Sequence, residues 1–131
     1  MNDAKEKVVF MIDLDGTMWA DTPNEEAATK TLTAEVHQNA VEWVNERYDE
    51  GHYICFFTAR WDKLREVTEQ KLENMKVNYH QLLMGKPRIR HTEYAGYHYI
   101  DNCAIIRANR FEGAWSDLVK KQIEIHTFEN E

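Results

Sequence analysis

The chain has 131 residues, of which 43% are hydrophobic and 11% aromatic, a composition typical of a folded protein with a hydrophobic core. Its formal net charge of −7 disfavours broad binding to nucleic acids or to anionic membranes, although a local basic patch is compatible with it. No apolar run approaches the roughly 20 residues that span a bilayer, and the N-terminal residues lack the pattern of a signal peptide.

The cysteines indicate the cellular compartment, and the glycines and prolines indicate the number of domains. Cys55 and Cys103 both lie in strand-like sequences, which predicts small buried residues in a reducing compartment rather than a disulfide or a metal pair. Only five glycines and two prolines interrupt the chain, and there is no internal repeat. We therefore expect one domain over residues 1–131 and a cytoplasmic location.

Apolar runs predict the strands. The run from Val8 to Leu14 is continuous, as expected for a strand covered on both faces, and residues 53–57 (YICFF) predict a second buried strand. Further short strands are predicted at 81–84, at 98–100 and starting at 105–106. Two segments predict loops: the polar flap 18–33 and the basic and aromatic stretch 87–97.

Apolar residues at helical spacing predict three helices. The first spans residues 34–49 and is ended by Gly51. The second spans residues 62–75, with Asp62 as its N-cap. Its expected inward-facing residues are Leu64, Val67, Leu72 and Met75. The third covers residues 115–123, and the alternation of strands and helices indicates an α/β sandwich on a mostly parallel sheet.

Polar residues follow the predicted strands at their carboxyl ends, where such sheets bind their ligands. They are Asp13, Asp15, Thr58, Lys86 and Asp101. Taken singly, each has an ordinary structural interpretation as a turn, a cap or a solvated loop residue. Taken together, three carboxylates at one edge would repel one another unless a divalent cation joined them, and Mg²⁺ suits such oxygen ligands. A lysine and a hydroxyl beside them would bind phosphate oxygens.

These residues resemble the motifs of the haloacid dehalogenase (HAD) superfamily of aspartate-dependent phosphohydrolases. DLDGT, residues 13–17, is similar to its first motif, and Thr58 after YICFF to its second. Lys86 in GKP is similar to the third motif, and Asp101 after YHYI to the fourth. The resemblance extends from residue 8 to about residue 106. It implies an HAD-like, Rossmann-like three-layer sandwich with a mostly parallel central sheet.

The resemblance also implies a role for each matching residue. Asp13 would be the nucleophile that forms an aspartyl-phosphate, and Asp15 would protonate the leaving group and then activate water. Thr58 and Lys86 would hold the transferring phosphoryl group. Asp13, the backbone carbonyl of Asp15 and Asp101 would ligate Mg²⁺. The acid at position 15 favours phosphoester hydrolysis over carbon–halogen cleavage.

One position departs from the pattern of many small relatives, which have a second Asp where this chain has Asn102. An Asn can orient a metal-bound water through its carbonyl oxygen but contributes no charge. We therefore expect weaker Mg²⁺ affinity, with Asn102 acting beside the metal ligands.

No cap domain is expected, because neither the segment 18–33 nor the segment 58–86 is long enough to hold one. Substrate specificity would then come from the flap and the loops. The candidate substrate-binding residues are Trp19, Arg60, Trp61, Arg88, Arg90 and His91. The two tryptophans are suited to stacking on a base or sugar, with partial burial as the commoner fate of a Trp. Arg60 is suited to a second phosphate or carboxylate, with a surface salt bridge as the alternative.

The sequence thus predicts a magnesium-dependent phosphomonoester hydrolase that acts on a small phosphorylated metabolite such as a sugar phosphate or a nucleotide. The alternative within the superfamily is a polynucleotide end phosphatase, which Arg88 and Arg90 favour and the acidic balance disfavours. A phosphoacceptor domain or a non-catalytic phosphate-binding module is a further alternative. The sequence leaves open the oligomeric state and the role of the C-terminal segment 120–131.

Overall fold

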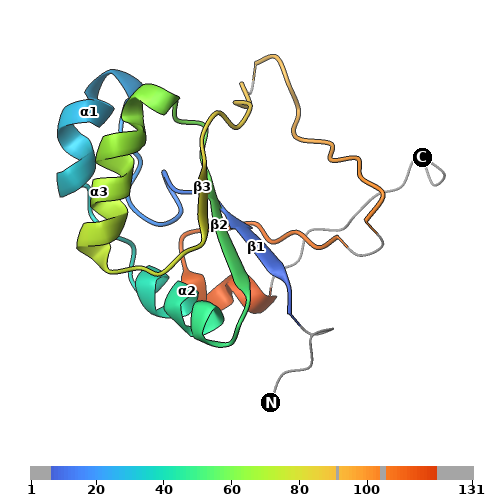
Figure 1. Ribbon diagram of the computed structural model, residues 1–131. Coiled ribbons are helices and arrows are strands. Elements are labelled where there is room, and N and C mark those ends of the chain that lie inside the picture. Colours follow the sequence, from blue (N-terminus) through green and yellow to red (C-terminus); the bar gives the residue numbers. More distant parts are fainter. Residues whose placement is uncertain (1–6, 91, 104–105, 121–131) are drawn as a thin grey trace. The chain divides into compact units, whose positions relative to one another are not determined.

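The computed structural model describes residues 7–90, 92–103 and 106–120, and the chain divides into two compact units, Met1–Pro87 and Arg88–Glu131. The first unit contains a three-stranded parallel sheet with helices packed on it, so the predicted α/β class is confirmed (Figure 1). Its elements are β1 (Val9–Ile12), η2 (Asn24–Glu26), α1 (Ala27–Lys30), η3 (Thr31–Thr33), α2 (Ala40–Asp49), β2 (Tyr53–Phe57), η4 (Asp62–Leu64), α3 (Arg65–Met75) and β3 (Gln81–Leu83).

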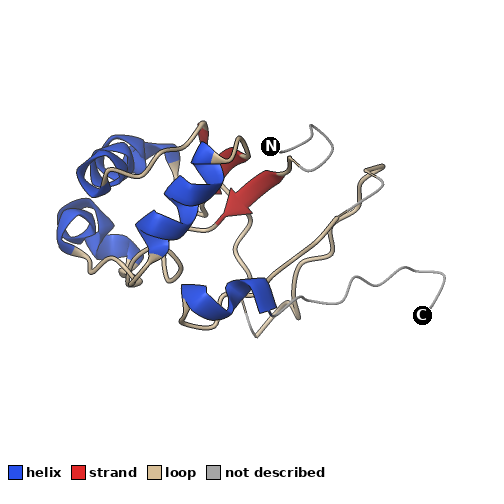
Figure 2. Cartoon of the chain, turned by 90° about the horizontal axis from the view of Figure 1, so that it is seen from below, coloured by secondary structure: helices blue, strands red, loops and turns tan. Residues whose placement is uncertain are grey.

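The strands lie in the order β1-β2-β3, and both neighbouring pairs are parallel. The two crossovers, through α2 and α3, therefore run in the same direction across the sheet. Because such crossovers are right-handed, they place both helices on the same face, and Figure 2 shows the helices of this unit on one side of the strands. Within residues 7–87 the fold has two layers, and the third layer of the predicted sandwich is not formed there.

Strand register determines which side chains enter the core. Phe10 pairs with Ile54, and Ile12 pairs with Phe56, so these four side chains share the face that the helices cover. The ring of Phe10 meets Trp43 of α2 edge to face, with centroids 5.3 Å apart. On the opposite face of β1, Val9 and Met11 are exposed. The prediction of a first strand covered on both faces is thus wrong within this unit, because all its helices lie on the other face.

Two predicted helix starts were wrong for local reasons. The helix predicted from residue 34 begins at Ala40, because residues 35–37 instead bond with the loop after β1: the Ala20 amide donates to the Glu35 carbonyl (2.8 Å) and the His37 amide donates to the Met18 carbonyl (2.9 Å). Asp62 does not cap α3 but lies in the first turn of η4. A carboxylate there still interacts favourably with the helix dipole.

The second unit is mostly irregular in the described residues. Residues 98–100 form no strand and are exposed, so the predicted fourth strand is wrong: its apolar Ile100 has no strand partner to bury it. A 3₁₀ helix, η5 (Trp115–Lys120), occupies the start of the predicted third helix, and Trp115 is buried with its ring centroid 5.4 Å from that of Phe111. The predictions for His91, for Ile105 and for residues 121–131 lie outside the described residues.

Neither cysteine is bonded to another, and Cys55 is buried as predicted, whereas Cys103 is exposed. Burial raises the pKa of the Cys55 thiol. Among the helices in the described parts of the chain, none is long and apolar enough to cross a membrane.

Candidate functional site

The carboxyl ends of the three strands carry the predicted site residues of the first unit. The backbone continues to be paired beyond the strands there: the Thr58 amide donates to the Leu83 carbonyl (2.9 Å), and the Lys86 amide donates to the Thr58 carbonyl (2.9 Å). Gly85 adopts a positive φ of 83°, which favours glycine and turns the chain after β3. Residues after β2 and β3 are therefore held side by side.

Asp13 lies directly after β1 and contacts Lys86 of the turn that follows β3. The Lys86 ammonium donates to Asp13 Oδ1 at 3.1 Å, and the Thr17 hydroxyl donates to Oδ2 at 3.4 Å. The side chain of Asp13 remains 39% exposed. A carboxylate that is held by a cation yet accessible is suited to attack an electrophile or to bind a metal ion.

Asp15 is held by a different cation. The Arg60 guanidinium donates from Nε to Asp15 Oδ2 and from Nη2 to Oδ1, both at 2.8 Å, and the indole Nε1 of Trp19 donates to Oδ1 at 3.1 Å. The two neighbouring carboxylates thus have separate partners, Lys86 for Asp13 and Arg60 for Asp15. Their charges are compensated within the first unit.

Backbone hydrogen bonds and buried side chains hold the loop after β1. The amides of Thr17 and Met18 donate to the Leu14 carbonyl at 3.0 and 2.8 Å, and Gly16 has a positive φ of 83°. Leu14 and Met18 are fully buried. This loop therefore holds the two carboxylates on a well-packed turn.

Thr58 is buried, and its hydroxyl accepts a hydrogen bond from the Arg60 amide at 3.1 Å. This short-range bond is the structural capping role that a Thr often has at a strand end. It also fixes the start of the segment that carries Arg60.

Two residues predicted to bind substrate are instead enclosed. Arg60 is 3% exposed, and Trp19 is completely buried, with the Arg60 guanidinium 5.4 Å from the centre of its ring. Trp61, by contrast, is 67% exposed. Only Trp61 of these three offers a surface for stacking in this geometry.

The remaining predicted site residues belong to the second unit, where Arg88, Arg90, Asp101 and Asn102 are all exposed. Asp101 accepts hydrogen bonds from the Tyr99 hydroxyl and the Asn102 amide, both at 2.6 Å, and from the Cys103 amide at 3.3 Å. The Tyr99 bond, followed by the Asn102 amide, holds the pKa of Asp101 below its usual range. The aspartate that the sequence associates with a metal thus forms a local turn and favours its ionised form.

The ligands that the resemblance implies for Mg²⁺ are all oxygen atoms, which hard cations prefer. Asp13 and the carbonyl of Asp15 lie in the first unit, and Asp101 in the second. In the described residues, no three His, Cys, Asp or Glu side chains gather closely enough to hold a metal ion.

The sequence did not predict the residues that hydrogen-bond to Arg60 and to the loops around the site. The Thr68 hydroxyl of α3 accepts from Arg60 Nη1 at 3.0 Å, and His37 Nδ1 lies 2.8 Å from the Thr17 carbonyl. Lys71 of α3 is buried and donates to the carbonyls of Leu32 and Ala34. The available signal for the two residues of α3 was their spacing: Thr68 lies four residues from both Leu64 and Leu72 and Lys71 four residues before Met75, so both fall on the apolar face of the predicted helix, where a polar residue is seldom buried without partners.

Replacing Lys71 by Met is expected to lower the free energy of unfolding by about 1–3 kcal/mol, because two carbonyls lose their donor. Burial, and then the Arg60 charge, lowers the pKa of Lys71 below the usual 10.5. Between that lowered value and 10.5 the unfolded state binds more protons, so wild-type stability rises with pH relative to Lys71→Met. Urea denaturation at several pH values measures both effects. The exposed Lys63→Met is the control, and equal losses in the two variants would contradict the prediction.

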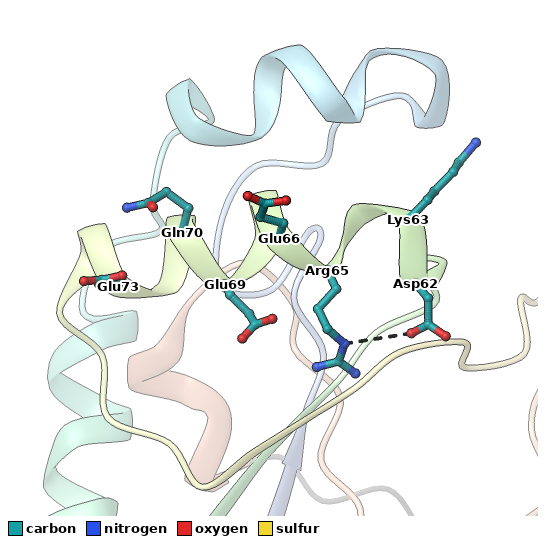
Figure 3. Close-up of a pocket in the computed structure, with 7 residues that line it drawn as sticks. All are labelled: Asp62, Lys63, Arg65, Glu66, Glu69, Gln70 and Glu73. Carbon is teal, nitrogen blue, oxygen red and sulfur yellow. Dashed lines mark ion pairs between the residues drawn. The ribbon is translucent and has the colours of Figure 1, made fainter.

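An open hollow runs along η4 and α3. Figure 3 shows its lining residues, which lie along η4 and α3: Asp62, Lys63, Arg65, Glu66, Glu69, Gln70 and Glu73. Arg65 is paired with Asp62 at 3.9 Å, and the other charges are acidic apart from Lys63. None of the predicted site residues lines this hollow, which is a solvated, mainly acidic helix surface.

No family model matches the chain, and no curated protein matches it. Among solved structures, the chain is similar to a crystal structure of a structural-genomics target from Vibrio cholerae, with 21% sequence identity and a TM-score of 0.51 over 74% of this chain and 81% of that chain. At this level of identity the likeness concerns the fold alone.

Proposed function

We propose that this protein is a magnesium-dependent phosphomonoester hydrolase of the HAD superfamily, without a cap domain, that acts on a small phosphorylated metabolite such as a sugar phosphate or a nucleotide. The observation that carries the proposal is the accessible Asp13 carboxylate with the Lys86 ammonium 3.1 Å from it and Asp15 held two residues further on. The short elements η2, α1 and η3 after β1, and η4 and α3 after β2, support the absence of a cap.

In the proposed reaction an Asp13 oxygen attacks phosphorus, and the bond from phosphorus to the leaving oxygen breaks. Asp15 donates a proton to that oxygen and then takes one from the water that hydrolyses the aspartyl-phosphate. Lys86 and the Thr58 hydroxyl would hold the phosphoryl oxygens. Asp13, the Asp15 carbonyl and Asp101 would hold Mg²⁺, which when bound offsets the negative charge of the phosphoryl group.

The test is release of inorganic phosphate from an aryl phosphate and from a panel of sugar phosphates, nucleotides and 3′- and 5′-phosphorylated oligonucleotides. We expect activity on at least one small ester that requires Mg²⁺ and is lost on chelation. Preference for the oligonucleotides would favour the polynucleotide phosphatase. Failure to hydrolyse any member of the panel would contradict a phosphatase and favour a phosphate-binding module.

Asn102→Asp is expected to lower the Mg²⁺ concentration that gives half-maximal activity by about tenfold, because it adds a charge beside a proposed ligand. A magnesium titration of phosphate release measures this. Asn78→Asp, an exposed substitution in the first unit, is the matched control for added charge. An unchanged magnesium requirement in Asn102→Asp would refute the prediction.

A further inference from the structure

Arg60 is an unusual residue for the position that it occupies. It follows a strand end and precedes an exposed Trp, yet it is 3% exposed. A buried guanidinium is stable only where its charge is paired and its N–H groups are bonded. The hydrogen-bond partners of Arg60 therefore indicate its role.

Arg60 grips both oxygens of one carboxylate. Nε bonds to Asp15 Oδ2 and Nη2 bonds to Oδ1, each at 2.8 Å, which is the parallel two-bond geometry that a guanidinium forms and a lysine cannot. Trp19 Nε1 adds a third bond, to Oδ1 at 3.1 Å. A carboxylate has about four acceptor positions, so these bonds occupy both positions on Oδ1 and one on Oδ2.

The guanidinium is itself held from behind by α3. Its third nitrogen, Nη1, donates to the Thr68 hydroxyl at 3.0 Å, and that hydroxyl donates onward to the Leu64 carbonyl at 2.6 Å. Thr22 of the segment after β1 lies 3.5 Å from Nη2. Thr68 is fully buried, so this support is shielded from water. A continuous hydrogen-bonded path thus runs from α3 through Arg60 to Asp15.

We propose that Arg60 is a positioning residue that orients the Asp15 carboxylate for proton transfer, rather than a residue that binds substrate. The guanidinium and the Trp19 indole leave one acceptor position on Oδ2. In the first step a proton held at this position passes to the leaving oxygen as its bond to phosphorus breaks. In the second step the same position takes a proton from the water whose oxygen bonds to phosphorus, so that Asp15 ends the cycle protonated, as it began. The inference rests on the proposed function.

The test separates positioning from substrate binding through kinetic constants on the best substrate of the panel. Arg60→Lys keeps the charge but loses the two-bond grip, and we expect kcat to fall about 10²-fold or more with KM changed less than threefold. Arg47→Lys, on α2, is the matched control and should leave both constants unchanged. In Arg60→Ala, added methylguanidinium should restore part of kcat by refilling the vacated space. Thr68→Val removes the acceptor behind Arg60 together with the bond that the hydroxyl donates to the Leu64 carbonyl, and it should lower kcat by a smaller factor, whereas Thr68→Ser should retain kcat.

The outcomes distinguish the two proposals. A KM that rises while kcat is unchanged in Arg60→Lys would overturn the positioning role and make Arg60 a substrate ligand. If Arg60→Ala is folded by circular dichroism but methylguanidinium restores nothing, and if Thr68→Val has wild-type kcat and pH–rate profile, the role is structural and the inference is wrong. A wild-type protein inactive on the whole panel would overturn the proposed function and this inference together.

Discussion

Asp13→Asn is expected to abolish phosphate release, with a loss of about 10⁴-fold or more in kcat, because an amide cannot act as the nucleophile in the way a carboxylate does. The substitution is nearly isosteric, and the remaining carbonyl oxygen can still accept the bond that Lys86 donates at 3.1 Å in the wild type. Thermal unfolding should therefore change little. The substitution is thus expected to lower kcat without lowering the stability of the fold.

The measurement combines turnover with detection of the covalent intermediate. Wild-type protein quenched in acid during turnover should show an added phosphoryl group by intact-mass spectrometry, and Asp13→Asn should show none. Asp21→Asn, an exposed acid in the segment after β1, is the matched control and should retain both signals. A phosphorylated Asp13→Asn protein would mean that another residue is the nucleophile.

Trp19→Ala is expected to have the largest effect on stability, a loss of about 3–5 kcal/mol in the free energy of unfolding. Trp19 is completely buried, and its indole lies near the cations of Arg60 and Lys71, at 5.4 and 5.7 Å from its ring centre. Truncation would leave a large cavity and would remove the Nε1 donor from Asp15. Such a loss is a large fraction of the stability of a typical domain.

Chemical denaturation of Trp19→Ala, Trp19→Phe and Trp61→Ala tests this. Trp19→Phe keeps most of the ring but not the donor, so we expect an intermediate loss. Trp61 is 67% exposed, and its truncation should change stability by about 0.5 kcal/mol or less. Equal stability losses in Trp19→Ala and Trp61→Ala would contradict the packing role of Trp19, and a raised KM without a stability loss would restore the predicted stacking role.

The regular elements that the sequence predicted well are those whose patterning is strong and local. The strand YICFF was predicted as β2 with its observed bounds, and the second predicted helix ends at Met75 as observed. Prediction failed for a short segment. Residues 98–100 are apolar enough for a strand, but a strand also needs a neighbour with which to pair, and three residues do not encode that neighbour.

The site shows the same division. Chain order placed Asp13 directly after the first strand, and parallel strand topology brought Lys86 to the same edge of the sheet, 3.1 Å from Asp13 Oδ1. The pairing of Arg60 with Asp15 joins residues 45 positions apart, and Thr68 lies behind them on α3. From sequence, an arginine after a strand end is as compatible with substrate binding as with a buried ion pair, because both uses need the same charge.

By itself, the sequence determined the α/β class and the position of Asp13, Thr58 and Lys86 after three parallel strands, since hydrophobic periodicity and chain order are local properties. Tertiary structure alone decided that Trp19 and Arg60 face inward, that the helices of the first unit cover one face of the sheet, and that Asp15 is gripped at both oxygens. These features depend on contacts between residues far apart in the sequence, such as Arg60 and Asp15, which are 45 positions apart. Such contacts are decided by packing, and a buried arginine is stable only if a carboxylate reaches it.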